Sequence, residues 1–237
     1  MLTLKEEPHM MIPGGLKEGG TSFEGHGFFE ASSMRKVGEK YYFVYSSKLS
    51  HELCYAVSDY PDREFTFGGT LISNGDIGYE GNQEPHNMMG NNHGGMVKAN
   101  GQWYIFYHRQ THGTESSRQG CAEKITIQED GSIKQVEMTS CGLNKGGLSD
   151  KGTYPAAIAC NLMGKDSIGK ITYGASLKDT QPYIFEENND LHYIANIGDG
   201  VVVGYKYFAV EKLSKVVLCL RGDAEGEIKV SADLAGK

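Results

Sequence analysis

Several features are missing from this sequence of 237 residues, and each absence narrows the possible functions. No run of lysine or arginine occurs, and the formal net charge is -7. That charge disfavours nucleic acid and anionic membranes as partners, because both are negatively charged. No apolar run is long enough for a transmembrane helix. Residues 1–8 lack the basic start and the apolar core of a secretory signal, which favours a cytoplasmic location.

Cysteine is present but does not form a recognisable motif. The five cysteines are widely spaced, and neither a CxxC pair nor a Cys/His cluster with zinc-ligand spacing occurs. We therefore expect reduced thiols in a core, which fits an intracellular protein or a part of one. These residues are Cys54, Cys121, Cys141, Cys160 and Cys219.

Strand signals dominate the chain, and no convincing amphipathic helix is found. Residues 41–47 and 103–107 are short runs rich in aromatic and β-branched side chains. Turn pairs such as Gly38-Glu39 and Asn100-Gly101 separate the runs. The sequence therefore predicts an all-β fold.

An internal repeat divides the first part of the chain. Residues 28–45 and 90–107 share a pattern in which Met34 corresponds to Met96, and Tyr42 to Tyr104. Each unit continues with two further predicted strands. Four antiparallel strands per repeat are typical of a β-propeller blade. A closed ring needs at least about four blades, so two blades predict that the chain is part of a longer protein. The further strands are expected at 52–58, 65–72, 118–127 and 132–138.

The pattern changes after residue 138. Residues 142–152 are rich in glycine, and short apolar runs follow at the spacing of a β-sandwich. We therefore place a propeller part at 1–140 and a truncated sandwich at 141–237. The strands of the second part are expected at 156–160, 183–185, 191–195, 201–208, 216–220 and 226–230.

Three motifs in the first part resemble family 43 glycoside hydrolases. Residues 25–36 (GHGFFEASSMRK) resemble the general-acid motif of that family. Residues 91–109 and 117–123 resemble its next blade, in the same order. Residues 154–162 and 193–208 are more loosely similar to a family 6 carbohydrate-binding module. The resemblance implies the last two blades of a five-bladed propeller, followed by part of a jelly-roll sandwich.

The resemblance also implies a reaction. Family 43 enzymes hydrolyse glycosides of arabinose- and xylose-containing plant polysaccharides and oligosaccharides with inversion. Inversion needs a protonated carboxylic acid and an ionised carboxylate about 6.5–9.5 Å apart. Glu30 matches the family's general acid. Neither of the family's two Asp motifs, one of them the base, is found in this sequence, so we expect the base outside it and negligible activity from the chain alone. The alternatives are a non-catalytic carbohydrate-binding protein and an inactive fragment.

Three further residues are candidates through the resemblance. His93 matches a histidine on the propeller axis that binds calcium, commonly through water, and Arg118 matches an arginine that contacts the sugar. His26 is expected to line the site beside Glu30. From the residues alone, His93 is a hydrogen-bonded core histidine, and Arg118 is a surface residue or an arginine that links two blades. No organic cofactor is implied.

Other polar residues are interpreted structurally. Asp76, Glu80 and Glu84 lie in a segment rich in Gly and Asn and could line the rim of the site, but solvated surface positions are the expected explanation. His108 and Tyr107 are expected to pack within their blade.

Overall fold

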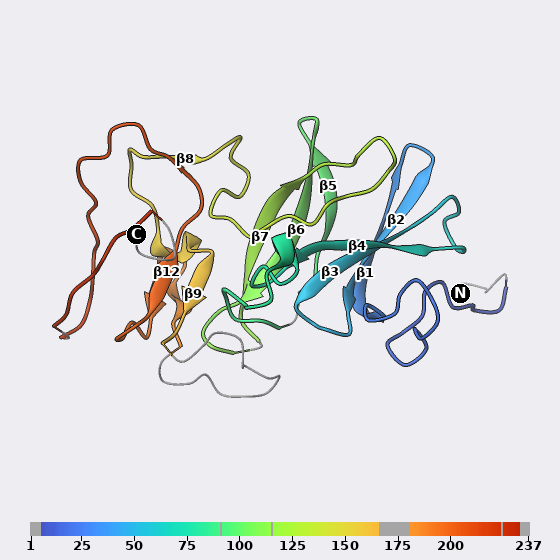
Figure 1. Ribbon diagram of the computed structural model, residues 1–237, viewed down its shortest axis with the longest axis horizontal. Helices are drawn as coiled ribbons and strands as arrows, with labels where there is room; N and C mark the ends of the chain where they lie inside the picture. Colours follow the sequence, from blue (N-terminus) through green and yellow to red (C-terminus); the bar gives the residue numbers. More distant parts are fainter. Residues whose placement is uncertain (1–5, 91, 115, 166–180, 224, 233–237) are drawn as a thin grey trace.

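The computed structural model describes residues 6–90, 92–114, 116–165, 181–223 and 225–232. Within these ranges the regular structure is strand, apart from two 3₁₀ turns at Tyr79–Gly81 and Ala156–Ile158. The first sheet, the second sheet and the strands of the C-terminal part follow one another along the long axis of the molecule (Figure 1). No helix in the described part is long and apolar enough to cross a membrane. The predicted all-β class is confirmed.

The first sheet is an antiparallel meander in the order β1-β2-β3-β4. The predicted turn at Gly38-Glu39 joins its first two strands, and Gly38 has a φ of 58°, which glycine adopts without strain. The strands are β1 (Phe28–Val37), β2 (Lys40–Ser47), β3 (Glu52–Ser58) and β4 (Thr66–Ser73).

The second sheet repeats the first with one strand fewer. It contains β5 (Gly95–Ala99), β6 (Gln102–Gln110) and β7 (Arg118–Ile125) in the order β5-β6-β7. Both turn residues, Asn100 and Gly101, have positive φ, as a tight hairpin with right-handed twist requires. Met96 is paired with Ile105, just as Met34 is paired with Phe43 in the first sheet. The predicted repeat is therefore present in the strand register.

The strand predicted at 132–138 is absent, because residues of the first sheet accept hydrogen bonds from the backbone of this segment. Ile127 and Ile133 form only an isolated bridge. The N–H of Ile133 donates to the Tyr55 hydroxyl at 2.9 Å, and that of Val136 donates to the carbonyl of Leu71 at 2.9 Å. The segment thus lies against β3 and β4 and is not the fourth strand of the second sheet.

One core joins the two sheets. Fully buried side chains from the first sheet, such as Leu53 and Leu71, cluster with Met96, Ile105 and Ile125 of the second. Burying an aliphatic side chain of this size stabilises the fold by roughly 1.5–3 kcal/mol. This shared core fixes how the ends of the two sheets lie relative to each other.

The C-terminal part consists of short paired strands. The pairs are β8 (Leu148–Ser149) with β13 (Phe208–Ala209), β9 (Asn161–Met163) with β12 (Val202–Gly204), and β10 (Tyr183–Asn188) with β11 (Leu191–Ala195).

Three strand predictions in this part are wrong. Residues 156–158 form a 3₁₀ turn, which follows Pro155. Residues 216–220 and 226–230 form no strand, although their composition favours one. Their apolar side chains are exposed, with Leu218 at 51% and Ile228 at 52%. A strand is stabilised by a ladder partner and a covered face, and none of the described residues supplies these.

Candidate functional site

Glu30 lies near the start of β1, where the strand is irregular. The pairing register with β2 shifts on both sides of Glu30, and Ala31 has a φ of 59°. Two such irregularities break the simple alternation of side chains along the strand. The carboxyl group of Glu30 is 40% exposed, and its Oε1 lies 2.7 Å from Nε2 of His93. The neighbouring Phe29 is half exposed.

His93 reaches Glu30 because two glycines follow it. An added Cβ at Gly94 would lie 1.9 Å from the carbonyl oxygen of Phe106, so only glycine allows this approach of β5 to β6. The N–H of His93 donates to Nε2 of His108 at 3.2 Å, and the two rings meet edge to face with centroids 5.0 Å apart.

His108 belongs to the site, although the sequence predicted only a packing role. Burial, followed by the positive charges of Arg118 and His93, lowers the pKa of His108 to about 4. The ring is therefore neutral near pH 7 and accepts the hydrogen bond from His93. One signal in the sequence could have identified it. The hairpin turn at Asn100-Gly101 sets a register that pairs Gly95 with Phe106, and the same register extended by two residues places His93 opposite His108.

Arg118 is the first residue of β7 and is exposed. It lies at the same end of the second sheet as His93, because its strand partner is Gln110 at the end of β6. The structure thus gathers Glu30, His93 and Arg118 at one end of the two sheets. A carboxyl group, a histidine pair and an exposed guanidinium could donate a proton and bind vicinal hydroxyl groups.

His26 belongs to a second group, centred on Glu52. Its Nδ1 lies 2.7 Å from Oε1 of Glu52, and its ring stacks on Phe67 at 4.7 Å. Ser47 and Thr70 donate to the same carboxylate at 2.6 and 2.9 Å. Burial by itself would raise the pKa of Glu52, but these hydrogen bonds outweigh it and lower the pKa to about 2. The hydrogen bond to Glu52 raises the pKa of His26.

The residues around His93 do not fit direct coordination of calcium. Calcium takes six to eight oxygen ligands. Here the carboxylate beside His93 is that of Glu30, its other side-chain neighbour is the imidazole of His108, and the positive charge of Arg118 acts on His108. Within the described ranges, His26, Glu52 and Cys54 form the group of three His, Cys, Asp or Glu side chains close enough to share an ion.

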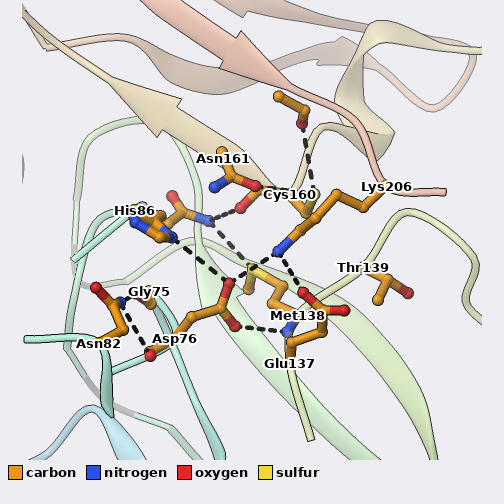
Figure 2. A network of polar contacts seen from close by, with 12 residues as sticks. Gly75, Asp76, Asn82, His86, Glu137, Met138, Thr139, Cys160, Asn161 and Lys206 are labelled. Atoms are coloured by element: carbon orange, nitrogen blue, oxygen red, sulfur yellow. Dashed lines mark hydrogen bonds and ion pairs between the residues drawn. The ribbon is translucent and has the colours of Figure 1, made fainter. Parts of the chain in front are cut away.

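A third polar group lies where the two parts of the chain meet. Asp76 was expected at the solvated surface, but that prediction is wrong, because it is 3% exposed. Its carboxylate accepts from the N–H of Met138 at 2.6 Å and from Lys206 Nζ at 3.0 Å. Lys206 also bonds Glu137 at 2.8 Å, and Figure 2 shows its amino group between the two carboxylates. Burial opposes the charge of Lys206, but both carboxylates raise its pKa.

This third group lines an open pocket of about 390 Å³. Glu80 and Asn82 lie on its rim, and His86 Nδ1 lies 3.8 Å from Asp76. The amide of Asn82 is occupied by backbone groups of its own loop, as Figure 2 shows in part.

Comparisons with known proteins identify one relative that matches the whole chain and others that match parts of it. No protein-family model matches the sequence. A xylosidase/arabinosidase of Thermoclostridium stercorarium is 46% identical over 245 residues, covering 100% of this chain. A beta-xylosidase of Xylanibacter ruminicola is 42% identical over 84 residues, which is 35% of this chain and 22% of that protein.

A solved structure is also similar. It is a GH43 β-xylosidase/α-arabinofuranosidase from a compost microbial metagenome, in a calcium-free form with xylotriose. The two sequences are 31% identical over the aligned region, which covers 46% of this chain and 30% of the solved one, with a TM-score of 0.39. Over its full length, this chain is therefore a homologue of a xylosidase/arabinosidase, of which it spans 52%.

Proposed function

We propose that this chain carries the general-acid part of an inverting family 43 glycoside hydrolase that acts on arabinose- and xylose-containing saccharides. The observation that carries the proposal is the 2.7 Å contact between Glu30 and His93, which come from different sheets. Sequence identity of 46% to a xylosidase/arabinosidase supports the substrate class. On this view the two sheets are adjacent blades of a propeller, and the C-terminal part is a sandwich related to carbohydrate-binding modules.

Each residue then has a role in the reaction. Glu30, when protonated, donates its proton to the leaving glycosidic oxygen. His93 holds the carboxyl group of Glu30 through Nε2, and neutral His108 holds the backbone of His93. Arg118 offers fixed N–H donors to vicinal hydroxyls of the sugar. The base that activates water is proposed to lie outside these 237 residues. No step is assigned to calcium.

The test uses a chimera, in which this chain replaces the matching segment of the Thermoclostridium relative. In this background we expect Glu30→Gln to lower kcat for aryl xylosides or arabinofuranosides about 10²–10⁴-fold, because the amide cannot donate the acid proton. Glu24→Gln removes an exposed carboxylate close by in sequence and should leave kcat unchanged. Initial rates from the released phenol provide the measurement.

Two results would contradict the proposal. One is an active chimera whose rate does not depend on Glu30. The other is an inactive chimera that still binds xylotriose in calorimetry, which would favour a non-catalytic carbohydrate-binding protein.

A further inference from the structure

The segment Gly25–Phe28, which leads into Glu30, is held by the buried carboxylate of Glu18. The N–H of Gly27 donates to Oε2 of Glu18 at 2.6 Å, and that of Gly25 donates to Oε1 at 3.2 Å. Glu18 is 6% exposed and also pairs with Lys48, which lowers the pKa of Glu18. An ionised carboxylate therefore anchors the backbone at Gly25 and Gly27, just before the irregular region that begins after Phe28.

Gly27 allows this contact only because it lacks a side chain. A Cβ added there would lie 2.1 Å from Oε2 of Glu18 and 2.8 Å from Cα of Gly15. A Cβ atom does not approach non-bonded atoms this closely, so the segment or the carboxylate would have to move.

Glu52 also holds this segment, through the ring of His26. The Tyr45 hydroxyl adds a hydrogen bond to the carbonyl of His26 at 2.7 Å. Both oxygens of Glu52 are already occupied, because His26 and Ser47 lie on one and Thr70 on the other. This group is therefore closed by its own hydrogen bonds and is better suited to hold the chain than to receive an ion.

Strand β1 carries this constraint to Glu30. Beyond Phe28 the strand slips register twice and passes through the positive φ of Ala31 before regular pairing resumes at Ser33. Glu30 is paired with Ser46 between the two shifts, so the ladder holds it by one pair and not by a continuous register. The segment that enters from the N-terminal side is therefore the other support available to Glu30 within β1.

We propose that Glu18 and Glu52 are positioning residues for Glu30. They hold Gly25–Phe28 at three of its residues, Gly25, His26 and Gly27, so that the irregular start of β1 presents the carboxyl group of Glu30 to His93. The catalytic consequence rests on the proposed function, whereas the positioning itself does not. A misplacement of about 1 Å at a reacting group costs on the order of 10²-fold in rate, which gives the expected size of the effect.

The first test follows the folded chain by NMR, with no substrate. Hydrogen bonds to charged groups contribute about 1.5–3 kcal/mol, so Glu18→Gln should speed amide exchange of Gly25 and Gly27 about tenfold or more. In Glu18→Gln and Glu52→Gln, the His93 ring resonance should shift toward its position in Glu30→Gln, because the carboxyl group has moved away. Glu39→Gln is the control, since that side chain is 94% exposed at the opposite end of β1.

A milder variant covers the case in which Glu52→Gln does not fold. Ser47→Ala removes one donor to Glu52 and keeps the buried carboxylate, so a smaller shift of the His93 resonance in the same direction is expected. Folded Glu18→Gln and Ser47→Ala proteins with unchanged exchange and an unchanged His93 resonance would overturn the proposal.

The second test measures catalysis in the chimera. Both glutamine variants should lower kcat about 10²-fold and leave KM unchanged, because Glu30 is displaced while the sugar still binds. If the chimera proves inactive, the proposed function fails, and the NMR experiment still decides whether the two carboxylates position Glu30. Normal kcat alongside a shifted His93 resonance would refute the catalytic consequence.

Discussion

Replacing Lys206 by methionine is expected to destabilise the protein by about 3–5 kcal/mol, because it leaves one buried and one partly buried carboxylate without their cation. Asp76 and Glu137 have side chains that are 4% and 16% exposed, and Lys206 contacts both. Methionine retains most of the side-chain length but removes the charge. Unfolding in urea, followed by the fluorescence of Trp103 and by circular dichroism, measures the loss.

Matched variants separate this effect from a general loss of charge. Lys40→Met removes a lysine that pairs with Asp59 at the surface, where the two side chains are 47% and 65% exposed, respectively. The free energy of unfolding should therefore change by less than about 1 kcal/mol. Adding Asp76→Asn to Lys206→Met should recover part of the lost stability, since an amide costs less to bury than an unpaired carboxylate. A Lys206→Met protein as stable as the Lys40→Met control would show that the pair contributes nothing.

Lys206 also shows why the third polar group could not be predicted from the sequence. Asp76 lies among Gly and Asn residues, which suggested a solvated loop. It is buried because a lysine 130 positions later supplies a counter-charge. Burial of an ionised group depends on its partner, and no local pattern indicates a partner so far along the chain.

The hairpins, by contrast, were predictable from local signals. The turns at Gly38-Glu39 and Asn100-Gly101 set the strand register, and the repeat then placed β1 and β2 in the same pairing as β5 and β6. The segment 132–138 has the composition of a strand, but the hydroxyl of Tyr55 and the backbone of β4 bind its N–H groups. Composition alone does not show which acceptor a donor will meet.

The same distinction applies to the candidate site. The contact between Glu30 and His93 depends on the shared core that aligns the two sheets, and the family resemblance pointed to both residues. Glu52 belongs to no recognisable sequence motif, and its donors come from three other segments. Its role in holding His26 is visible only once β1–β4 are assembled.

Glu123→Gln is expected to stabilise the protein near neutral pH and to change how its stability depends on pH. Glu123 is 5% exposed and accepts two hydrogen bonds from Thr139, at 2.6 and 2.7 Å. Burial, the dominant influence, raises the pKa of Glu123 from 4.5 to about 7. Glutamine can keep both contacts with Thr139, because its amide both accepts and donates.

The sign of the effect follows from proton binding. Between pH 4.5 and 7 the folded protein holds a proton on Glu123 that the unfolded chain has released, so the folded state loses stability as pH rises. The loss is complete above pH 7, and a shift of this size corresponds to about 3 kcal/mol. His108 has a lowered pKa and contributes the opposite slope, so the difference between variant and parent is the useful quantity.

The difference in the free energy of unfolding between Glu123→Gln and the parent should therefore be small near pH 4.5. It should grow to about 3 kcal/mol at pH 8 in favour of the variant. Urea unfolding at half-unit pH steps gives the curve, and Glu129→Gln, which alters an exposed carboxylate on the following turn, should give a flat one. A difference that does not change with pH would mean that Glu123 is already ionised in the folded protein at pH 5. In that case its bonds to Thr139 outweigh the cost of burying the charge.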